Sequence, residues 1–466
     1  MSHQGKFFSQ VVVTGAILSV SSAFAAGFGL YEGSARGNAL GGAILGKAQD
    51  ASANYYNPAS MTDLTGTVVT VGMTTEHPKA DALVDGHKAR KLDPGCFVLP
   101  HLYVVQELPY RFWFGLGIAP EFGLGSHYHQ SWPLAWDTRS TTIKGITVNP
   151  NVAYKVTDDW SVSAGIRLSY FDFDQYSDKM AVSHGDNFGT VRDHLKGYDA
   201  FLDWGWQIST KYDITKKLSA GVFYKSFIDT RVKGYNHTHV RHYNDEAVRR
   251  QVGKGIEAAL QSAGLAPGMP GYQQYYDAAF QQKYPAAVAQ AHRQVKEGAD
   301  SADGAASANL RLPQSLSLGI NYDLADDWHL GAAATWIQWS SMDDLLFDLP
   351  GDNDRNVPMK WNDAWRYGFG VAYDVTKEFS LMGSWVYDID PCSKYHCTTM
   401  LPPGSRQIMT FGFAYRWRQF ELTASYGLVF MNGESTYISD DLGNRYRFST
   451  RNGLSHAAAV SLSYFF

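Results

Sequence analysis

The feature that most constrains this 466-residue chain is an alternation of apolar and polar side chains with a period of two, repeated in many short runs. Successive side chains of an extended strand point to opposite faces, so this period indicates strands with one apolar face. Fourteen such runs occur, an even number that suits a closed antiparallel barrel. They lie at 66–76, 98–107, 110–121, 144–156, 160–173, 197–213, 217–232, 313–323, 328–340, 364–375, 378–388, 405–417, 419–431 and 454–466.

The last run shows which kind of β protein to expect. One face carries Ala458, Val460, Leu462, Tyr464 and Phe466, and the other is mostly serine and alanine. An apolar outer face over a polar inner face is typical of a barrel in a membrane. A soluble β-sandwich would alternate similarly, but it would not explain why aromatic residues, 14% of the chain, gather at strand ends. We therefore predict a 14-stranded antiparallel transmembrane β-barrel. The mean hydropathy of −0.27 agrees with this, because the apolar and polar faces of alternating strands average to near zero.

Targeting and charge agree with export to an outer membrane. Residues 1–25 combine Lys6, an apolar run and a small-x-small end at 23–25, which is the pattern of a signal peptide. No later apolar run is long enough for a membrane-spanning helix. Short and long connectors alternate along the strands, which predicts periplasmic turns, external loops and both termini on the periplasmic side. The net charge of −5 without a basic block argues against nucleic acid as a partner.

The segment at 26–65 precedes the predicted barrel at 66–466. It is rich in Gly, Ala, Ser and Asn, so it cannot bury a core of its own. A barrel of fourteen strands encloses a lumen that its own side chains do not fill. We expect this segment to be a plug inside the lumen.

Several local motifs are similar to those of one family. They are Ala26-Gly27-Phe28, the Gly/Ala-rich run with Asp50-Ala51, Asn57-Pro58-Ala59, and Pro313-Gln314-Ser315 followed by Trp328 and Trp339. With them the chain resembles the FadL-type outer-membrane transporters of long-chain fatty acids and aromatic hydrocarbons.

The resemblance implies a function and its rivals. It implies a monomeric channel in outer-membrane lipid for the passive uptake of long hydrophobic molecules, with fatty acids first and monoaromatic hydrocarbons as the alternative. A surface lipase or protease barrel would need a catalytic constellation, and none stands out in the sequence. An open porin would need a water-filled lumen. We therefore expect no enzyme activity and no cofactor.

The connector at 233–312 is too long for a plain loop and should be partly helical. Asn244 can cap a helix with Val248, Val252 and Ile256 on one face. Two further helical patterns begin at Tyr272 and at 285. These helices either pack on each other over the barrel mouth or form an external apolar groove for substrate.

Residues of the plug and the lumen are candidates for the substrate path. Phe28 and Leu30 are apolar enough to meet substrate, whereas Asn57, Pro58 and Ala59 should anchor the plug to the wall. We predict that the first residues of the plug move when ligand binds, and the alternative is a static seal. By alternation five cations and two acidic residues also point into the lumen, and the cations either pair with acidic residues or hold a carboxylate head group. These residues are Arg167, Lys211, Lys225, Arg231 and Arg366, with Asp203 and Asp374; the candidates for the substrate path are Arg167, Lys225, Arg231 and Arg366.

The strand near 110–122 contains Gly115, Gly117 and Pro120, which should interrupt its ladder. A kink there would open the wall, and the resemblance implies sideways exit of substrate into the lipid. The alternative is a harmless bulge near the rim.

Export to an oxidising compartment affects how the cysteine and histidine residues are interpreted. Cys392 and Cys397 enclose a short loop that contains His396, and we expect a disulfide there in preference to a metal site. His127, His129, His237, His239 and His242 have the one-residue spacing that a metal site can use, but they fall in predicted external loops and are interpreted as solvated side chains, so we expect no metal.

Overall fold

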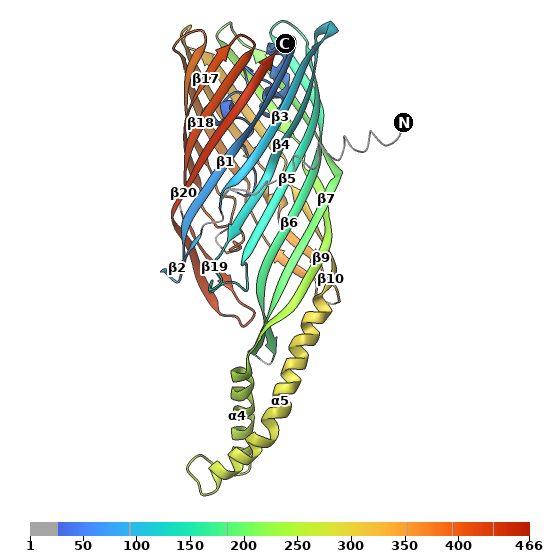
Figure 1. The fold of residues 1–466 in the computed structure, drawn as a ribbon, viewed down its shortest axis with the longest axis vertical. Helices are drawn as coiled ribbons and strands as arrows, with labels where there is room; N and C mark the ends of the chain where they lie inside the picture. Colours follow the sequence, from blue (N-terminus) through green and yellow to red (C-terminus); the bar gives the residue numbers. More distant parts are fainter. Residues whose placement is uncertain (1–26, 93–94, 184, 352, 394, 432) are drawn as a thin grey trace, which may run out of the picture.

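One antiparallel sheet closes on itself to form a barrel (Figure 1). The computed structural model describes residues 27–92, 95–183, 185–351, 353–393, 395–431 and 433–466, so the expected signal peptide at 1–25 lies outside the described residues. The first strand, β1 (Thr67–Val84), pairs along its length with the last strand, β20 (Arg445–Phe465). This pairing closes the barrel and confirms the predicted fold class.

Fourteen of the described strands make up the ring. In order they are β1, β3 (Phe97–Leu108), β4 (Phe112–His127), β5 (Ser140–Lys155), β6 (Trp160–Ser183), β7 (Asp186–Asp213), β8 (Leu218–Lys225), β11 (Ser315–Asp323), β12 (Trp328–Ile337), β15 (Ala364–Asp374), β16 (Phe379–Asp388), β17 (Arg406–Trp417), β18 (Phe420–Met431) and β20. Further strands extend the sheet beyond the ring, namely β2 (His87–Leu92), β9 (Ile228–Tyr243), β10 (Gly304–Leu312), β13 (Asp344–Asp348), β14 (Arg355–Pro358) and β19 (Ser435–Ser439).

The predicted strand at 217–232 is wrong in one respect. β8 ends at Lys225, and β9 begins at Ile228 after a break at Ser226 and Phe227. Phe223 is buried in β8, whereas Ile228 and its even-numbered neighbours are buried in β9. The two-residue break therefore moves the inward face from odd-numbered to even-numbered positions, which alternation along an unbroken strand cannot foresee.

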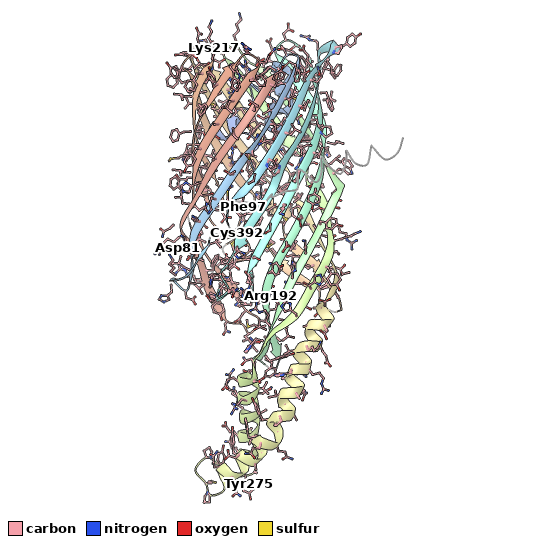
Figure 2. The ribbon with its side chains drawn as sticks, in the orientation of Figure 1. Asp81, Phe97, Arg192, Lys217, Tyr275 and Cys392 are labelled. Atoms are coloured by element: carbon pink, nitrogen blue, oxygen red, sulfur yellow. A yellow bond between two sulfur atoms is a disulfide. The ribbon has the colours of Figure 1, made fainter. Side chains whose placement is uncertain are left out.

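The two ends of the barrel differ. Short connections such as η2 (Pro109–Arg111) lie at the end that also holds the C-terminus, and we call this the short-turn end (Figure 1). Lys217 marks it in Figure 2, where Tyr275 marks the opposite extreme. The other end, which we call the long-loop end, carries the loops and a helical hairpin that projects away from the barrel.

The hairpin consists of α4 (Asp245–Ser262) and α5 (Tyr272–Ala302). The Asn244 side chain accepts a hydrogen bond from the Ala247 N–H, which is the expected N-cap. The two helical patterns predicted after Tyr272 are one helix that continues through Pro285. Buried Val248 packs with residues of α5 and β7, so this apolar face does not form an open groove.

The outer surface of the ring is strongly apolar. Aromatic side chains such as Phe411, 71% exposed, and Phe369, 52% exposed, point away from the lumen. Among the described helices, none has the length and apolarity needed to cross a bilayer. The exposed apolar face thus belongs to the strands, as the lipid-facing belt of a barrel requires.

The N-terminal segment, residues 27–64, lies inside the barrel and is largely buried. It contains α2 (Ala35–Ala39), α3 (Ala53–Tyr56) and η1 (Pro58–Asp63). α2 contacts β16, β17, β18 and β20, while η1 contacts β4 to β7. The segment therefore touches both sides of the lumen.

Candidate functional site

Phe28 lies in a cage of aromatic side chains inside the barrel. Its ring centroid is 4.9 Å from that of Trp339, 5.8 Å from Phe122, 6.0 Å from Trp361 and 6.4 Å from Phe171. Only 4% of Phe28 is exposed. Tilted and edge-to-face contacts of this kind stabilise a ring beyond simple burial. The cage is an apolar site of aromatic size that the N-terminal segment itself occupies.

The backbone beside Phe28 pairs with β4 at a break in the wall. β3 and β4 are paired only as far as Ile118, and beyond it the described residues of these two strands share no ladder. There the N–H of Leu30 donates to the carbonyl of Glu121 at 2.8 Å, and the N–H of Gly123 donates to the carbonyl of Phe28 at 2.7 Å. The N-terminal segment thus adds a short strand to β4 where β3 has left it.

Pro120 lies at this break. The register between β4 and β5 shifts between Pro120 and Phe122, so Glu121 forms a bulge. Proline has no N–H to donate to a ladder, which explains why pairing changes here.

Gly115 and Gly117 have a different role from the one predicted. Both remain in the ladders with β3 and β5, so the expectation that they interrupt the strand is wrong. A Cβ at Gly115 would lie 2.2 Å from Asn54 Oδ1, and one at Gly117 would lie 2.7 Å from Asn54 Nδ2. These glycines are needed because the N-terminal segment packs directly against the wall.

Glu121 anchors a buried charge cluster that sequence reasoning missed. Its carboxylate accepts hydrogen bonds from Arg167 (2.7 and 3.1 Å), Lys225 (2.5 Å) and Thr147 (2.9 Å). The side chains of Arg167 and Glu121 are 2% and 4% exposed. Alternation from Gly115 and Gly117 places Glu121 on the inner face, so the sequence contains a signal for this buried carboxylate.

The other two predicted lumen cations, Arg366 and Arg231, lie on opposite faces of the barrel wall. Arg366 lies inside, where its Nη1 donates to the carbonyl of Gly41 at 3.3 Å and its guanidinium lies over the ring of Tyr31 at 4.8 Å. Arg231 faces outward, is 57% exposed and lies 3.9 Å from Asp348. Its predicted inward orientation is wrong because the break after Lys225 reverses the faces.

The corner at Asn57 contacts the wall. Asn57 Nδ2 donates to the carbonyls of Leu45 (2.6 Å) and Thr210 (3.2 Å), and its Oδ1 accepts from the N–H of Ala59. The same N–H is 2.9 Å from Ser209 Oγ. Pro58 occupies the first position of η1, where its missing N–H costs nothing.

Charged side chains dominate the lumen toward the short-turn end. Arg36 pairs with Asp50 at 3.2 Å and with Glu421 at 2.5 Å. On the opposite wall Lys47 pairs with Asp323 at 2.7 Å, and Asp323 also meets His329 at 2.6 Å. An apolar molecule moving straight through would have to displace these paired charges and lose solvation of each.

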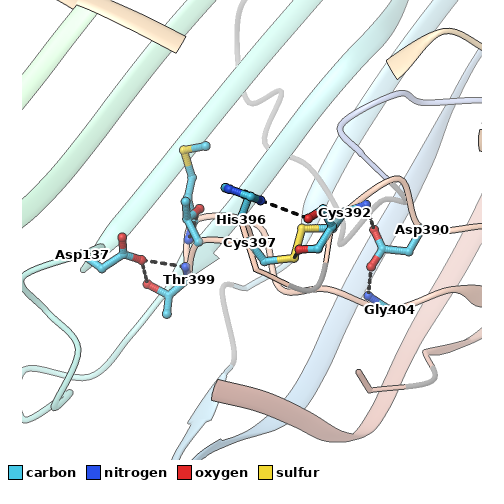
Figure 3. The surroundings of a disulfide bond; sticks show 10 residues. Asp137, Asp390, Cys392, His396, Cys397, Thr399 and Gly404 are labelled. Carbon is cyan, nitrogen blue, oxygen red and sulfur yellow. Dashed lines mark hydrogen bonds between the residues drawn. A yellow bond between two sulfur atoms is a disulfide. The ribbon is translucent and has the colours of Figure 1, made fainter. Parts of the chain in front are cut away.

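External loops cover the aromatic cage from the long-loop end. Met342, Phe347, Met400 and Leu401 belong to the same buried apolar cluster as Phe28. A disulfide joins Cys392 and Cys397 within the last of these loops (Figure 3).

Hydrogen bonds hold this disulfide loop in place. Thr399 bonds to Asp137 of the neighbouring loop through its N–H (2.7 Å) and its hydroxyl (2.6 Å). The carboxylate of Asp390 accepts from the N–H groups of Cys392 and Gly404, but burial raises the pKa of Asp390 to about 6.

The described residues contain no cluster of three or more His, Cys, Asp or Glu side chains that could hold a metal ion. His194 and His237 face each other across β7 and β9, with ring centroids 6.3 Å apart. They lie on the extension beyond the ring and not beside the aromatic cage.

A closed barrel with an apolar belt, a lumen that is apolar toward the long-loop end and charged toward the short-turn end, and residues 27–64 folded inside defines a class, the transport barrels of bacterial outer membranes. The chain belongs to the outer membrane protein transport family (OMPP1/FadL/TodX), whose model matches residues 16–466. The predicted family and the outer-membrane location are therefore confirmed. Members of this family transport hydrophobic compounds across the outer membrane.

Named relatives span nearly the whole chain. The long-chain fatty acid transport protein of Escherichia coli O6:H1 is 21% identical over 95% of both chains, and outer membrane protein P1 of Haemophilus influenzae is 24% identical over 93% of this chain and 92% of its own. Among solved structures, a Pseudomonas aeruginosa FadL homologue has a TM-score of 0.76 at 20% identity, covering 94% of this chain and 100% of its own. The Pseudomonas putida toluene transporter TodX has a TM-score of 0.64 at 16% identity, covering 94% and 99%. At these identities the structural likeness shows the fold alone.

Proposed function

We propose that this protein is a passive uptake channel for long hydrophobic molecules, with long-chain fatty acids as its main substrates. The observation that carries the proposal is the position of Phe28. The phenyl ring of Phe28 fills an aromatic cage. This cage lies beside the place in the described barrel where β3 and β4 stop pairing. A substrate that displaces Phe28 would thus reach an apolar site that already adjoins a break in the wall.

We propose that substrate leaves sideways between β3 and β4. The charged layer around Arg36 and Lys47 supports this route, because an apolar molecule gains nothing by crossing paired charges. Leu30, Leu99 and Ile146 form an apolar cluster at the break, with Ile118 packed against it. Apolar side chains thus line the break between β3 and β4 beside the buried, paired Glu121, whereas the route toward the short-turn end passes between the ion pairs of Arg36 and Lys47.

The N-terminal residues act as the gate in this proposal, and the corner at Asn57 stays fixed. Residues 28–30 are held by two backbone hydrogen bonds to β4, a hydrogen bond from the Tyr55 hydroxyl to the Leu30 carbonyl (2.8 Å) and the buried side chains of Phe28 and Leu30. None of these contacts belongs to the ladders between ring strands, so this part can detach without breaking the barrel. By contrast, Asn57 is bonded both within the segment and to the carbonyl of Thr210 in β7.

Monoaromatic hydrocarbons are the second candidate substrates. The observation in their favour is the cage itself, whose present occupant is a single phenyl ring. We infer no catalytic role, because the members of this family are transporters and channels.

A reversible lock tests the proposal. Gly29 bridges Phe122 of β4, so a Gly29→Cys/Phe122→Cys variant should form a cross-strand disulfide that fixes the N-terminal residues to the wall. The variant is expressed in cells that have no other fatty-acid uptake route. Their rate of labelled palmitate uptake should fall at least tenfold after oxidation and recover after mild reduction.

Each single-cysteine variant serves as a control for the loss of the Phe122 ring. Wild-type protein under the same redox treatment controls for the native disulfide. Undiminished palmitate uptake by the locked variant would show that the segment is a static seal. A photoreactive palmitate that labels residues near Lys47 but none at 97–101 or 119–127 would exclude lateral exit.

A further inference from the structure

Two irregularities interrupt the wall of the barrel, with strands β5, β6 and β7 between them. One is the bulge at Glu121 in β4, and the other is the break at Ser226 and Phe227 between β8 and β9. Among the described strand ladders, none includes Glu121 or Ser226 as a paired residue. The positions of these two residues therefore depend on contacts other than the regular ladder.

Arg167 of β6 joins the two irregularities. Its guanidinium donates to Glu121 Oε2 from Nε (3.1 Å) and Nη2 (2.7 Å), and to the carbonyl of Ser226 from Nη1 (2.9 Å). The Arg167 side chain is 2% exposed, so water does not compete for these bonds. Because a guanidinium is planar and presents its N–H groups in a fixed fork, the three bonds hold the bulge and the break in one relative position.

Glu121 links this ion pair to the N-terminal segment. Both of its carboxylate oxygens are bonded, since Oε2 also accepts from the Thr147 hydroxyl (2.9 Å) and Oε1 accepts from Lys225 Nζ (2.5 Å). The backbone carbonyl of the same residue accepts the hydrogen bond from the Leu30 N–H (2.8 Å). Because Glu121 has no ladder partner, its side-chain bonds fix the direction of that carbonyl. Arg167 thus helps to place the acceptor that holds Leu30 to the wall.

Stability of the fold is a weak explanation for this cluster. A buried ion pair adds little net stability compared with well-packed apolar side chains of similar volume, because both charges lose their solvation. The best-attested role of such a pair is to specify one arrangement of the groups around it. Here the groups around it are the bulge that receives the N-terminal residues and the break that precedes β9.

From these contacts we propose that Arg167 is a positioning residue of the gate. It holds the bulge at Glu121 in the shape that accepts the N-terminal residues, and so it sets how readily substrate detaches them. The inference rests on the proposed gating function and adds a residue that is not part of the aromatic cage. Through Ser226 the same guanidinium also ties the gate to the start of the extension that carries the helical hairpin.

Hydrogen exchange on the purified full-length protein in detergent tests the positioning role. In Arg167→Met, Glu121 keeps Lys225 as its cation, so no buried charge is left unpaired. The Leu30 amide should nevertheless exchange about tenfold faster, because the charged hydrogen bonds that fix its acceptor are lost. The Ser226 amide, which donates to the carbonyl of Trp206 (2.9 Å), should also exchange faster.

Two further variants show whether the fork itself is required. Arg167→Lys keeps the charge, but an ammonium group cannot reproduce the fork, so this variant should lose protection at Leu30 as Arg167→Met does. Lys47→Met is the matched control, because it breaks another ion pair between the segment and the wall, the pair with Asp323 toward the short-turn end. Its Leu30 amide should exchange at the wild-type rate.

Binding of labelled palmitate separates a positioning role from a merely structural one. If substrate must detach the N-terminal residues, a gate that detaches about ten times more readily gives an apparent affinity up to about tenfold higher. Arg167→Met should therefore bind palmitate more tightly than wild-type protein. A barrel with general damage would bind it less tightly.

Wild-type exchange at Leu30 in Arg167→Met, full protection in Arg167→Lys, or equal acceleration in Lys47→Met would each overturn the positioning role. Weaker palmitate binding by Arg167→Met would overturn it as well. Should Arg167→Met fail to fold, Arg167→Lys decides by the same exchange measurement. A wild-type protein that binds no palmitate would refute the proposed function instead, and exchange at Leu30 would still decide the role of Arg167.

Discussion

Truncating Phe28 should release the N-terminal residues from the wall. Phe28→Ala removes a ring that touches four aromatic neighbours and is 4% exposed. Burial of a phenylalanine in a well-packed site is worth roughly 3–5 kcal/mol relative to alanine. Even about 3 kcal/mol would raise the population of the detached state more than 100-fold, because each 1.4 kcal/mol is a factor of ten.

Hydrogen exchange of the peptide that covers residues 27–35 measures this population. The Leu30 amide in this peptide and the Gly123 amide in β4 donate the two backbone hydrogen bonds between the segment and the wall, and both amides should lose protection by about two orders of magnitude in Phe28→Ala. Phe448→Ala is the matched control, because Phe448 of β20 is fully buried in a separate cluster that includes residues of β1 and β19. Exchange at 27–35 that stays within a few fold of wild type, or that rises equally in both variants, would refute the reasoning.

Two further predictions concern packing and pH. Gly115→Ala should destabilise the folded barrel by about 1–3 kcal/mol in thermal unfolding, because its Cβ would overlap Asn54. Gly255→Ala in α4, where a Cβ meets open space, is the control and should not destabilise the barrel. Equal unfolding temperatures of the two variants would contradict the close packing at Gly115. The raised pKa of Asp390 means that the folded loop favours the protonated carboxyl group. The loop after β16 should therefore be more stable at pH 5 than at pH 7.5, and this extra stability should be lost as the pH rises through about 6. Exchange in that loop, corrected for intrinsic rates, checks this, and Asp390→Asn should abolish the difference.

Much of the fold follows from local pattern. A period of two needs no tertiary information, so the strand positions, their even number and the order of connections could be predicted. The helix that begins after Asn244 was also predictable, because a cap and an apolar face are properties of adjacent residues. The prediction failed at the break after Lys225, where two residues reverse the faces and carry Arg231 to the outside.

The site depended on contacts between segments far apart in the sequence. Composition indicated that residues 26–65 needed an enclosure, and alternation brought Arg167, Lys225 and Arg366 to the lumen. Nothing local shows that Phe28 meets Trp339 and Trp361 from distant loops. Likewise, Gly115 is explained only by the approach of Asn54. Side-chain direction is a property of the strand, whereas the aromatic cage and the break beside Ile118 exist only after the barrel has closed around residues 27–64.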